Sequence, residues 1–386
     1  MTPQVLQELA RKHGTPLYVY DGIYLRKRAV WLQDLCQPSG CLLRYAVKAN
    51  PHPKIIKLYD KLGLHFDASS EYEAEHLTDL GIEPRKISLS SQQPPRNMRK
   101  ALDSNIKFVA TSLHQLDLVA QSGWRRELAV RLNPGLGSGH SRRTTTGGVS
   151  SSFGIWHEYL PLVLAWQKES GCVIDRVQTH IGSGADPKIW RKIIVQALKL
   201  VKELPSVTAL NLGGGYSVAR MPNEKETDMA AVLKGFKEEL DTFQRRTGRN
   251  IDLEIEPGTW LVANSGYLLS RIIDIVDTGK KGFSFLKLDT GMNDLLRPTL
   301  YGAQHPIDVL TSAKTYRDYV IVGHNCESGD LLTPEPGNSE NIMPRRLKEA
   351  RIGDLVIIGG AGAYAASMRA IGYNSFPSAA EIFINE

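Results

Sequence analysis

The sequence predicts a (β/α)8 barrel of the TIM type, followed by an all-β domain at the carboxyl end. Eight short apolar runs alternate with segments of helical periodicity between residues 42 and 256, and parallel strands need such long crossovers. After about residue 265 the apolar runs follow one another with only turn residues between them, which is typical of an antiparallel sheet. Residues that could take part in catalysis or binding occur where the predicted barrel strands end. Active sites of such barrels are built at these strand ends.

The predicted barrel is expected to span residues 22–265. Its strands are predicted at 42–48, 64–68, 87–90, 108–111, 128–133, 177–181, 209–212 and 253–256. Residues 159–166, 190–204 and 229–243 have the apolar spacing of helices. An open doubly wound sheet is the competing architecture, but no dinucleotide fingerprint follows the first strand.

The second domain is expected to span residues 266–386. Its strands are predicted at 271–276, 283–288, 319–322, 355–358 and 380–384. The opening run of residues 17–20 reads as a strand before the barrel, and residues 1–21 are expected to contribute it to the second domain.

Composition excludes several classes of protein. No stretch approaches 18 apolar residues, so no membrane span is expected, and the first residues lack the apolar core of a secretion signal. The four cysteines are scattered without metal-ligand spacing, which predicts a reduced, cytoplasmic protein with no metal site. The net charge is +6, but basic residues form only short pairs, so nucleic acid is not an expected partner.

Lys48 is the most informative residue, because it stands where the apolar strand of residues 42–47 ends. An ammonium group desolvated at such a place has a lowered pKa, and the free amine can form a Schiff base with an aldehyde. The alternative is a lysine whose amine reaches the surface along its apolar stem.

The other predicted strand ends carry groups that suit a phosphorylated aldehyde. Gly213–Gly215 would let main-chain N–H groups approach a phosphate, and Ser183 can donate a hydroxyl to it. His180 can lie against an aromatic ring. Glu256 would keep a pyridine nitrogen protonated, which makes the ring an electron sink. Neutralisation of Glu256 by Arg131 inside the barrel is compatible with that role.

Motifs along most of the chain resemble the pyridoxal-phosphate-dependent decarboxylases of the alanine-racemase-like fold, most closely the diaminopimelate decarboxylases. They are Tyr45–Asn50, His180–Gly184, Gly213–Gly215, Glu256–Gly258, Asp289–Pro298, Cys326–Asp330 and Gly362–Tyr364. The segment Gly137–Trp156, with His140, is similar to one subgroup of these enzymes.

The resemblance implies a pyridoxal 5'-phosphate site with a role for each motif. Lys48 would form the Schiff base, His180 would stack on the ring and Glu256 would pair with its nitrogen. Cys326 would come from the neighbouring subunit to protonate the substrate carbon, so a homodimer is expected. The further cofactor-binding residues implied are Asp67, Arg131, Ser183, Gly214, Gly215, Gly258, Thr259 and Tyr364.

The resemblance also implies a substrate pocket lined by Arg297, Tyr301, Glu327, Tyr364 and Thr259. The distal carbon of diaminopimelate carries a carboxylate, which Arg297 can clamp, and an ammonium group, from which Glu327 can accept. Purely structural roles are the alternatives for two of these residues. Arg297 could form a salt bridge with Asp294 or Asp289, and Cys326 could be an inert buried thiol.

Three departures from the family pattern stand out. Thr259 occupies the position after Glu-Pro-Gly where the family usually has an arginine, and Arg220, Arg271 or Arg369 are candidates to compensate. Ser152 replaces a lysine common before Phe-Gly-Ile, and the chain ends at Glu386, earlier than in relatives.

These observations predict a homodimeric pyridoxal-phosphate enzyme, a carboxy-lyase that converts meso-2,6-diaminopimelate to L-lysine and CO2 in lysine biosynthesis. A decarboxylase of carboxynorspermidine, ornithine or a carrier-bound amino acid is the alternative that Thr259 favours. A non-catalytic homologue would be expected to lack Lys48 or Cys326, and both are present.

Overall fold

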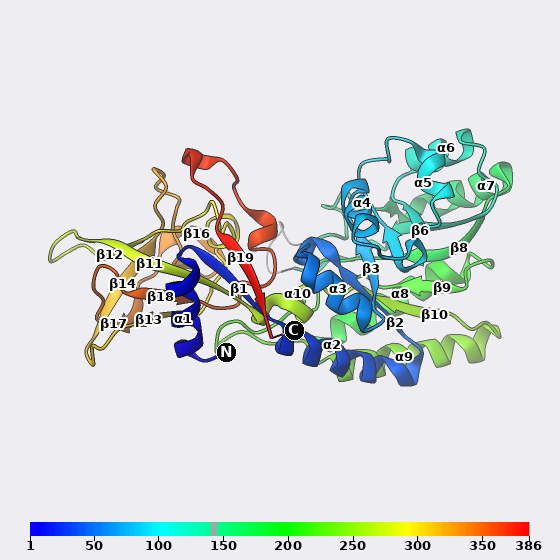
Figure 1. Ribbon diagram of the computed structural model, residues 1–386. Helices are drawn as coiled ribbons and strands as arrows, with labels where there is room; N and C mark the ends of the chain where they lie inside the picture. The colour runs from blue at the N-terminus through cyan, green and yellow to red at the C-terminus, as the bar shows by residue number, and fades with distance from the viewer. Residues whose placement is uncertain (140–144, 386) are drawn as a thin grey trace. The chain divides into compact units, whose positions relative to one another are not determined.

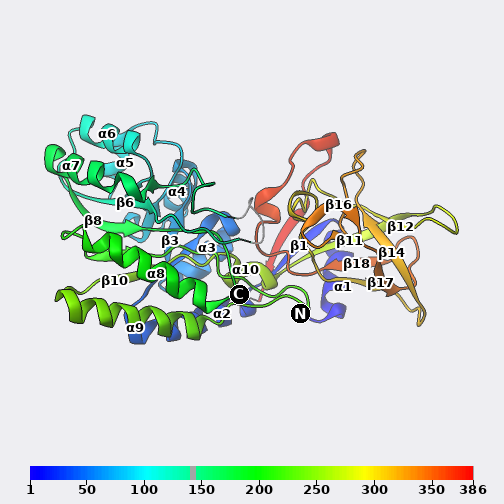
Figure 2. The ribbon, with the colours of Figure 1, turned by 180° about the vertical axis from the view of Figure 1, so that it is seen from behind.

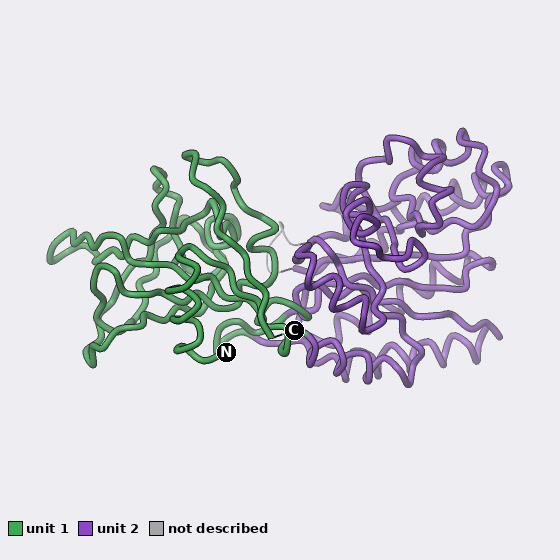
Figure 3. The backbone as a smooth tube through the Cα atoms, in the orientation of Figure 1, with its two compact units in different colours: residues 1–25, 218–224, 261–386 green, residues 26–217, 225–260 purple. Residues whose placement is uncertain are grey.

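The computed structural model describes residues 1–139 and 145–385, and the chain divides into two compact units (Figure 3). Unit 1 contains residues 1–25, 218–224 and 261–386, and unit 2 contains residues 26–217 and 225–260. The short segment 218–224 thus leaves the chain of unit 2 and belongs to unit 1. No helix among the described residues combines the length and the apolar content needed to cross a bilayer.

Unit 2 is a closed barrel of eight parallel strands, surrounded by helices (Figures 1 and 2). The barrel strands are β2 Leu42–Ala46, β3 His65–Ala68, β4 Ile87–Leu89, β5 Lys107–Ala110, β6 Glu127–Asn133, β8 Val173–Gln178, β9 Ala209–Asn211 and β10 Asp252–Ile255. They pair in the order β5-β4-β3-β2-β10-β9-β8-β6, and the pairing of β5 with β6 closes the ring. The predicted (β/α)8 barrel is confirmed, and the open sheet is excluded.

The helices of the barrel alternate with its strands. They are α2 Gly22–Cys36, α3 Pro53–Lys61, α4 Glu71–Asp79, α5 Met98–Asp103, α6 Leu113–Gln121, α7 Leu160–Ser170, α8 Pro187–Lys202, α9 Met229–Thr247 and α10 Thr259–Val262. Local sequence explains several starts, since Ser70, Ser112 and Asp228 each accept a hydrogen bond from the main chain of the first turn. The helices predicted from spacing correspond to α7, α8 and α9, with ends that differ by up to four residues.

Strand β8 differs from its prediction at both ends. It begins at Val173 rather than residue 177, because Asp175 forms an ion pair with Lys107 (2.8 Å) and so occupies a strand position despite its charge. It ends at Gln178, so His180 lies in the loop beyond the strand. A ninth strand, β7 Ile155–Trp156, pairs with the end of β6 and is too short to be visible as a pattern.

Unit 1 is mostly β-sheet, as predicted, with the order β13-β18-β11-β12-β14-β17. Its elements are α1 Pro3–His13, β1 Leu17–Asp21, β11 Gly266–Asp277, β12 Ser284–Leu288, α11 Arg297–Tyr301, β13 Ile307–Leu310, β14 Tyr316–Val322, β15 Pro334–Glu335, β16 Asn338–Ile342, β17 Arg345–Lys348, β18 Leu355–Ile358 and β19 Ala380–Ile384. Strand β1 pairs antiparallel with β11 and parallel with β19. Strands β13, β15, β16 and β17 were not predicted, because they are short and largely polar or exposed.

Helix α1 and the strands around β11 enclose the apolar core of unit 1. The buried members are Leu6, Ala10, Leu17, Val19, Leu269, Leu355 and Ile357. Leu6 and Ala10 are four residues apart and therefore lie on one face of α1. Burial of this face explains why the amino-terminal segment belongs to the same unit as the carboxyl-terminal strands.

A buried ion network joins three strands of the barrel. Glu254 on β10 pairs with Arg44 on β2 (2.9 Å) and with Arg176 on β8 (2.9 Å), and its side chain is only 4% exposed. Burial alone would raise the pKa of this carboxyl group, but the charge and hydrogen bond of Arg44, with Arg176, hold it below the usual value. Two cations therefore depend on one carboxylate.

We expect Glu254→Gln to lower the free energy of unfolding by about 3–5 kcal/mol, because it leaves both arginines buried without a counter-charge. Asp103→Asn is the matched control, since Asp103 pairs with Arg99 at an exposed site (2.7 Å; 50% exposed) and should change stability by less than about 1 kcal/mol. Urea unfolding of the two variants provides the comparison. Equal losses would contradict the importance of the network.

Candidate active site

Lys48 lies at the carboxyl end of β2, in the 3-10 turn Val47–Ala49. The side chain is half-buried between the buried residues Val47 and Ala49, and its Nζ donates to Oγ of Ser69 (3.0 Å), just beyond β3. The main-chain N–H of Ala46 donates to the carbonyl of Pro257 (3.3 Å), which ties the end of β2 to the segment after β10. The amine is thus directed along the carboxyl edge of the barrel rather than toward bulk solvent.

Three further predicted residues are buried at the same end of the barrel. Asp67, Arg131 and Glu256 are 2%, 7% and 5% exposed. Burial, reinforced by the negative charge of Glu256, raises the pKa of Asp67 well above its usual value, against the opposing charges of Lys48 and Arg131. Burial lowers the pKa of Arg131, and its Nη2 has no hydrogen-bond partner. The site therefore combines buried charge with unused hydrogen-bonding capacity.

Glu256 is held in place by two residues that sequence reasoning missed. Gln178 Nε2 (2.7 Å) and Asn211 Nδ2 (2.6 Å) both donate to Oε1 of Glu256. Ser90 in turn donates to Oε1 of Gln178 (2.9 Å), which fixes the orientation of that amide. The only signal in the sequence was a polar side chain at the last position of two buried strands, β8 and β9.

His180 follows β8 and packs against the glycine turn after β9. Its Nδ1 is buried without a partner. Burial, with the positive charges of Arg131 and Lys48, lowers the pKa of His180 well below its usual value, so the ring is neutral at pH 7. A neutral imidazole can lie against an aromatic ring without bringing a further positive charge into the site.

Three main-chain segments meet without intervening side chains beside these groups. The carbonyl of Gly213 accepts from the N–H of Glu256 (2.8 Å), and the carbonyl of Gly215 accepts from that of Gly184 (3.1 Å). A Cβ atom at Gly215 would overlap the carbonyl oxygen of Gly182, and Gly215 has a φ of +98°. Only glycine therefore allows this close approach of the two turns, 182–184 and 213–215, which we call the glycine cradle.

Ser183, Gly258 and Thr259 lie in or beside this cradle. Ser183 is half-buried, and its N–H donates to the carbonyl of Ser138 (2.9 Å). Gly258 packs on the side chains of Ala46 and Ala49, and Thr259 is the first residue of α10. His140 falls outside the described residues, whereas Ser152 accepts a hydrogen bond from Gln92 (3.3 Å).

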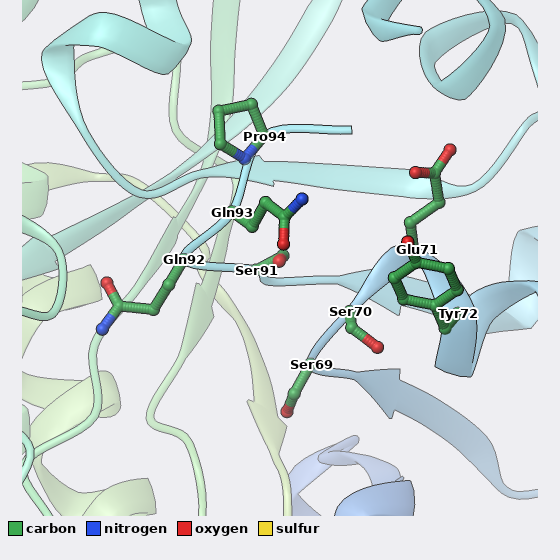
Figure 4. A pocket seen from close by; sticks show the side chains of 8 residues that line it. All are labelled: Ser69, Ser70, Glu71, Tyr72, Ser91, Gln92, Gln93 and Pro94. Atoms are coloured by element: carbon green, nitrogen blue, oxygen red, sulfur yellow. The ribbon is translucent and has the colours of Figure 1, made fainter. Parts of the chain in front are cut away.

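Two segments beyond β3 and β4 line a pocket of about 210 Å³ (Figure 4). The pocket is lined by Ser69–Tyr72 and by Ser91–Pro94. Ser69, which accepts from Lys48, is part of its wall. The described residues contain no group of three or more His, Cys, Asp or Glu side chains that could hold a metal ion.

The remaining predicted residues belong to unit 1. Arg297 begins α11 and Tyr301 ends it. Asp294 and Asp289 bond to other groups, including the hydroxyl of Thr290 and the main-chain N–H of Arg271, and neither pairs with Arg297. Nε of Arg297 is buried without a partner. The alternative prediction, a salt bridge between Arg297 and one of these aspartates, is therefore wrong.

Tyr364 stands in a left-handed main-chain conformation, with a φ of +53°. Such a conformation costs free energy for a non-glycine residue and persists only where the surroundings impose it. It follows the glycine-rich segment after β18 and interacts electrostatically with both Arg220 and Arg297.

Cys326 and Glu327 lie on an exposed loop of unit 1. Cys326 is a free, exposed thiol, and its main-chain N–H donates to Oδ1 of Asn374 (2.7 Å). The N–H of Gly329 (3.1 Å) and the hydroxyl of Tyr373 (3.1 Å) donate to Glu327 and lower the pKa of its carboxyl group. The thiol at position 326 is therefore exposed in this chain, contrary to the alternative of a buried thiol.

A sequence model of the pyridoxal-dependent decarboxylases, pyridoxal binding domain, matches residues 25–263. The chain belongs to this family. Diaminopimelate decarboxylase of Streptomyces coelicolor is 33% identical over 98% of this chain and 87% of the relative, and that of Escherichia coli K12 is 30% identical over 100% and 92%.

Solved structures of the family are similar over almost the whole chain. A crystal structure of diaminopimelate decarboxylase is 30% identical, has a TM-score of 0.91 and covers 99% of this chain and 91% of its own. The Helicobacter pylori enzyme complexed with L-lysine is 28% identical, with a TM-score of 0.86 and coverage of 98% and 94%. A lysine/ornithine decarboxylase of Vibrio vulnificus, at 21% identity and a TM-score of 0.84, shares the fold.

The residues of the decarboxylase barrel fit a pyridoxal group by their chemistry. The glycines of the cradle have no side chains that would obstruct a phosphate, and the buried carboxylate of Glu256 is aligned by two amides. Buried atoms of Asp67, Arg131 and His180 lack partners within the protein. A bound polar aromatic ring would therefore satisfy groups that the fold leaves unsatisfied.

We expect Asp67→Asn to stabilise the decarboxylase prepared without cofactor at neutral pH. A carboxyl group with a raised folded-state pKa loses stability as pH rises from its unfolded pKa, about 3.9, through the folded one, at up to about 1.4 kcal/mol per pH unit. The variant's advantage should be absent near pH 4 and should grow as pH increases.

Urea unfolding at a series of pH values measures this difference. Asp117→Asn, at an exposed position on α6, is the control and should follow the wild type at every pH. A wild-type protein whose stability relative to Asp67→Asn does not change between pH 4 and 8 would show that Asp67 is ionised in the folded state.

Proposed function

We propose that this chain is a carboxy-lyase that removes CO2 from meso-2,6-diaminopimelate and releases L-lysine, with pyridoxal 5'-phosphate as its cofactor. The observation that supports this substrate is the guanidinium group of Arg297, which forms no ion pair with an acidic side chain of the described residues and whose buried Nε has no hydrogen-bond partner. A substrate with a distal carboxylate would supply that charge. Relatives named diaminopimelate decarboxylase at 30–33% identity support the assignment.

Most of the residues proposed to hold the cofactor lie at the carboxyl end of the barrel. Ser183, Gly214, Gly215, Gly258 and Thr259 would bind the phosphate at the glycine cradle, with Tyr364 as a further ligand. His180 would lie against the ring as a neutral imidazole. When bound, the cofactor supplies a protonated pyridine ring that accepts the electron pair left when CO2 departs.

Polar side chains of the barrel would bind the cofactor or hold a proton on it. The amine of Lys48 would bind the cofactor aldehyde and exchange with the substrate amine. Glu256, aligned by Gln178 and Asn211, would hold the proton on the ring nitrogen. Arg131 and Asp67 share this buried environment with Glu256, and the two carboxylates act on the charge of Arg131.

We infer that the active enzyme is a homodimer in which Cys326 serves the site of the neighbouring subunit. The thiol is exposed on a loop whose conformation is fixed by Asn374 and by the bonds of Glu327. Exposure leaves it available to a second chain, where it would donate a proton to the substrate carbon. Glu327, ionised and oriented by Tyr373, would accept from the distal ammonium group. A cytoplasmic location remains a prediction.

The alternative is a decarboxylase for a substrate with a different distal group, such as carboxynorspermidine, ornithine or a carrier-bound amino acid. Thr259 favours it, because a hydroxyl offers one neutral hydrogen bond where the family's arginine offers two charge-assisted ones. The cost in binding a distal carboxylate would be about 1–3 kcal/mol.

The proposed activity is tested by following CO2 release and amine products from the cofactor-loaded protein. We expect L-lysine from meso-2,6-diaminopimelate and at least about 100-fold lower kcat/KM for ornithine and lysine, a difference of about 2.7 kcal/mol. Lys48→Ala should be inactive, whereas Lys57→Ala, at an exposed position on α3, should retain activity. Activity confined to ornithine would overturn the assignment.

We expect Cys326→Ala to retain the absorbance of the bound cofactor and to lose turnover by about 10²–10⁴-fold, the usual contribution of a positioned proton donor. Cys326→Ser should recover part of the activity, because a hydroxyl can occupy the same place. Mixing inactive Cys326→Ala with inactive Lys48→Ala should restore up to a quarter of the activity if the sites are shared, as random pairing produces one intact site in half of the dimers. No recovery on mixing would contradict shared sites.

A further inference from the structure

Unit 1 contains a second guanidinium close to that of Arg297, and no carboxylate of the described residues bonds to either. Arg220 lies in segment 218–224, which joins unit 1 although both its neighbours in sequence belong to the barrel. Its Nη2 is buried without a partner, as is Nε of Arg297. The positive charge of Arg297 acts on Arg220, and the charges of Glu224 and Tyr364 act on both arginines. Glu224 is not in hydrogen-bond contact with either guanidinium group among the described residues.

The nearest acidic residue is used by the main chain. Oε2 of Glu224 accepts from the main-chain N–H of Arg220 (2.7 Å) and from that of Met221 (3.3 Å). These bonds shape the turn and leave the guanidinium of Arg220 without a carboxylate in contact. Its Nε donates instead to the carbonyl of Gly360 (3.0 Å), a neutral acceptor.

The approach of Arg220 to Gly360 is built into the fold. Gly360 has a φ of +65°, and a Cβ atom there would lie 2.9 Å from both Cγ and Cδ of Arg220. Only glycine permits the aliphatic stem to cross the main chain at this point. The guanidinium is therefore positioned rather than free to reach solvent.

A neutral histidine completes this cluster. Nδ1 of His305 bonds to the carbonyl of Gly359 (2.9 Å), and its Nε2 is buried without a partner. Burial, with the charges of Arg220 and Arg297, lowers the pKa of His305 well below its usual value. A group that would otherwise add a third positive charge is held neutral, as expected where the cations await an anion from outside the protein.

Two other arginines were candidates to replace the one missing at Thr259, and both are occupied. Arg369 forms an ion pair with Glu381 (2.9 Å), and its guanidinium carbon lies 5.2 Å from the ring centroid of Tyr18. Arg271 donates to the carbonyl of Gly353 (2.8 Å) at an exposed site. Arg220 alone of the three has a buried guanidinium nitrogen and no acidic partner among the described residues.

We propose that Arg220 and Arg297 together form the subsite for the distal carboxylate of the substrate, so that Arg220 takes over the task of the arginine replaced by Thr259. This inference rests on the proposed function, since it assigns the specificity of that site. Two guanidinium groups can bind one carboxylate through both of its oxygens and so exclude substrates that end in a bare ammonium group. A phosphate is the other anion of suitable chemistry.

The test compares holoenzymes carrying Arg220→Gln, Arg220→Lys and the control Arg271→Gln. Arg220→Gln is expected to raise KM for meso-2,6-diaminopimelate at least tenfold and to leave kcat/KM for L-lysine, which lacks the distal carboxylate, within threefold. Arg220→Lys should have a smaller increase in KM, because lysine keeps the positive charge but cannot donate the two parallel hydrogen bonds of a guanidinium group. Arg271→Gln should behave as the wild type. Thermal unfolding shows whether each variant is folded. If Arg220→Gln does not fold, the comparison of Arg220→Lys with the wild type is the test.

Binding of pimelate, a dicarboxylate without amino groups, separates this inference from the proposed function. Calorimetric titration should show a dissociation constant at least tenfold weaker for Arg220→Gln than for the wild type. If the wild type does not decarboxylate diaminopimelate but this loss is seen, the substrate assignment fails and the anion subsite stands. If Arg220→Gln has the same pimelate affinity and the same substrate selectivity as the wild type, the proposed subsite is wrong. It is also wrong if the wild type neither binds pimelate nor decarboxylates diaminopimelate. A tenfold loss of pyridoxal phosphate affinity with unchanged pimelate binding would assign Arg220 to the phosphate and also overturn it.

Discussion

Closure of the parallel barrel through the pairing of β5 with β6 is the constraint on which the rest of the site depends. Parallel strands place all their carboxyl ends at one rim, so residues more than two hundred positions apart in sequence become neighbours. Lys48 after β2 and Glu256 after β10 lie at the same rim because β2 and β10 are paired parallel neighbours. The main-chain hydrogen bond from the N–H of Ala46 to the carbonyl of Pro257 continues that pairing beyond the two strands.

Two glutamates near the carboxyl end of β10 have different surroundings. Glu254 lies inside a closed network, where Arg44 and Arg176 satisfy it and the network stabilises the fold. Glu256, two residues later, is aligned by neutral amides instead, and Arg131 beside it keeps an unsatisfied nitrogen. The carboxylate of Glu254 is thus neutralised by two cations, whereas that of Glu256 is bound by neutral amides. In unit 1, Arg369 forms an ion pair with Glu381, whereas no ion pair is formed by Arg220 or Arg297 among the described residues.

The loops of unit 1 contain the residues that are predicted to bind the distal group of the substrate. Its loops are rigidly organised, since Asp330 accepts from the main-chain N–H groups of Met292 (2.6 Å) and Asn325 (2.9 Å) and so joins the loop of Cys326 to the turn before Arg297. A substrate subsite assembled from such loops can change by single substitutions without disturbing the barrel. The change at Thr259, with Arg220 as its proposed counterpart, would be a case of this kind.

The sequence by itself determined the barrel, the sheet-rich second unit and the motif residues, because periodicity and strand-end chemistry are local patterns. It missed Gln178 and Asn211, since a polar residue at the end of a strand carries no sign of the carboxylate it will face. It could not choose among Arg220, Arg271 and Arg369, because the difference lies in which acidic side chain folding brings within reach. Only the tertiary structure decides that, as hydrogen bonds and counter-charges are set by distances between residues remote in the chain.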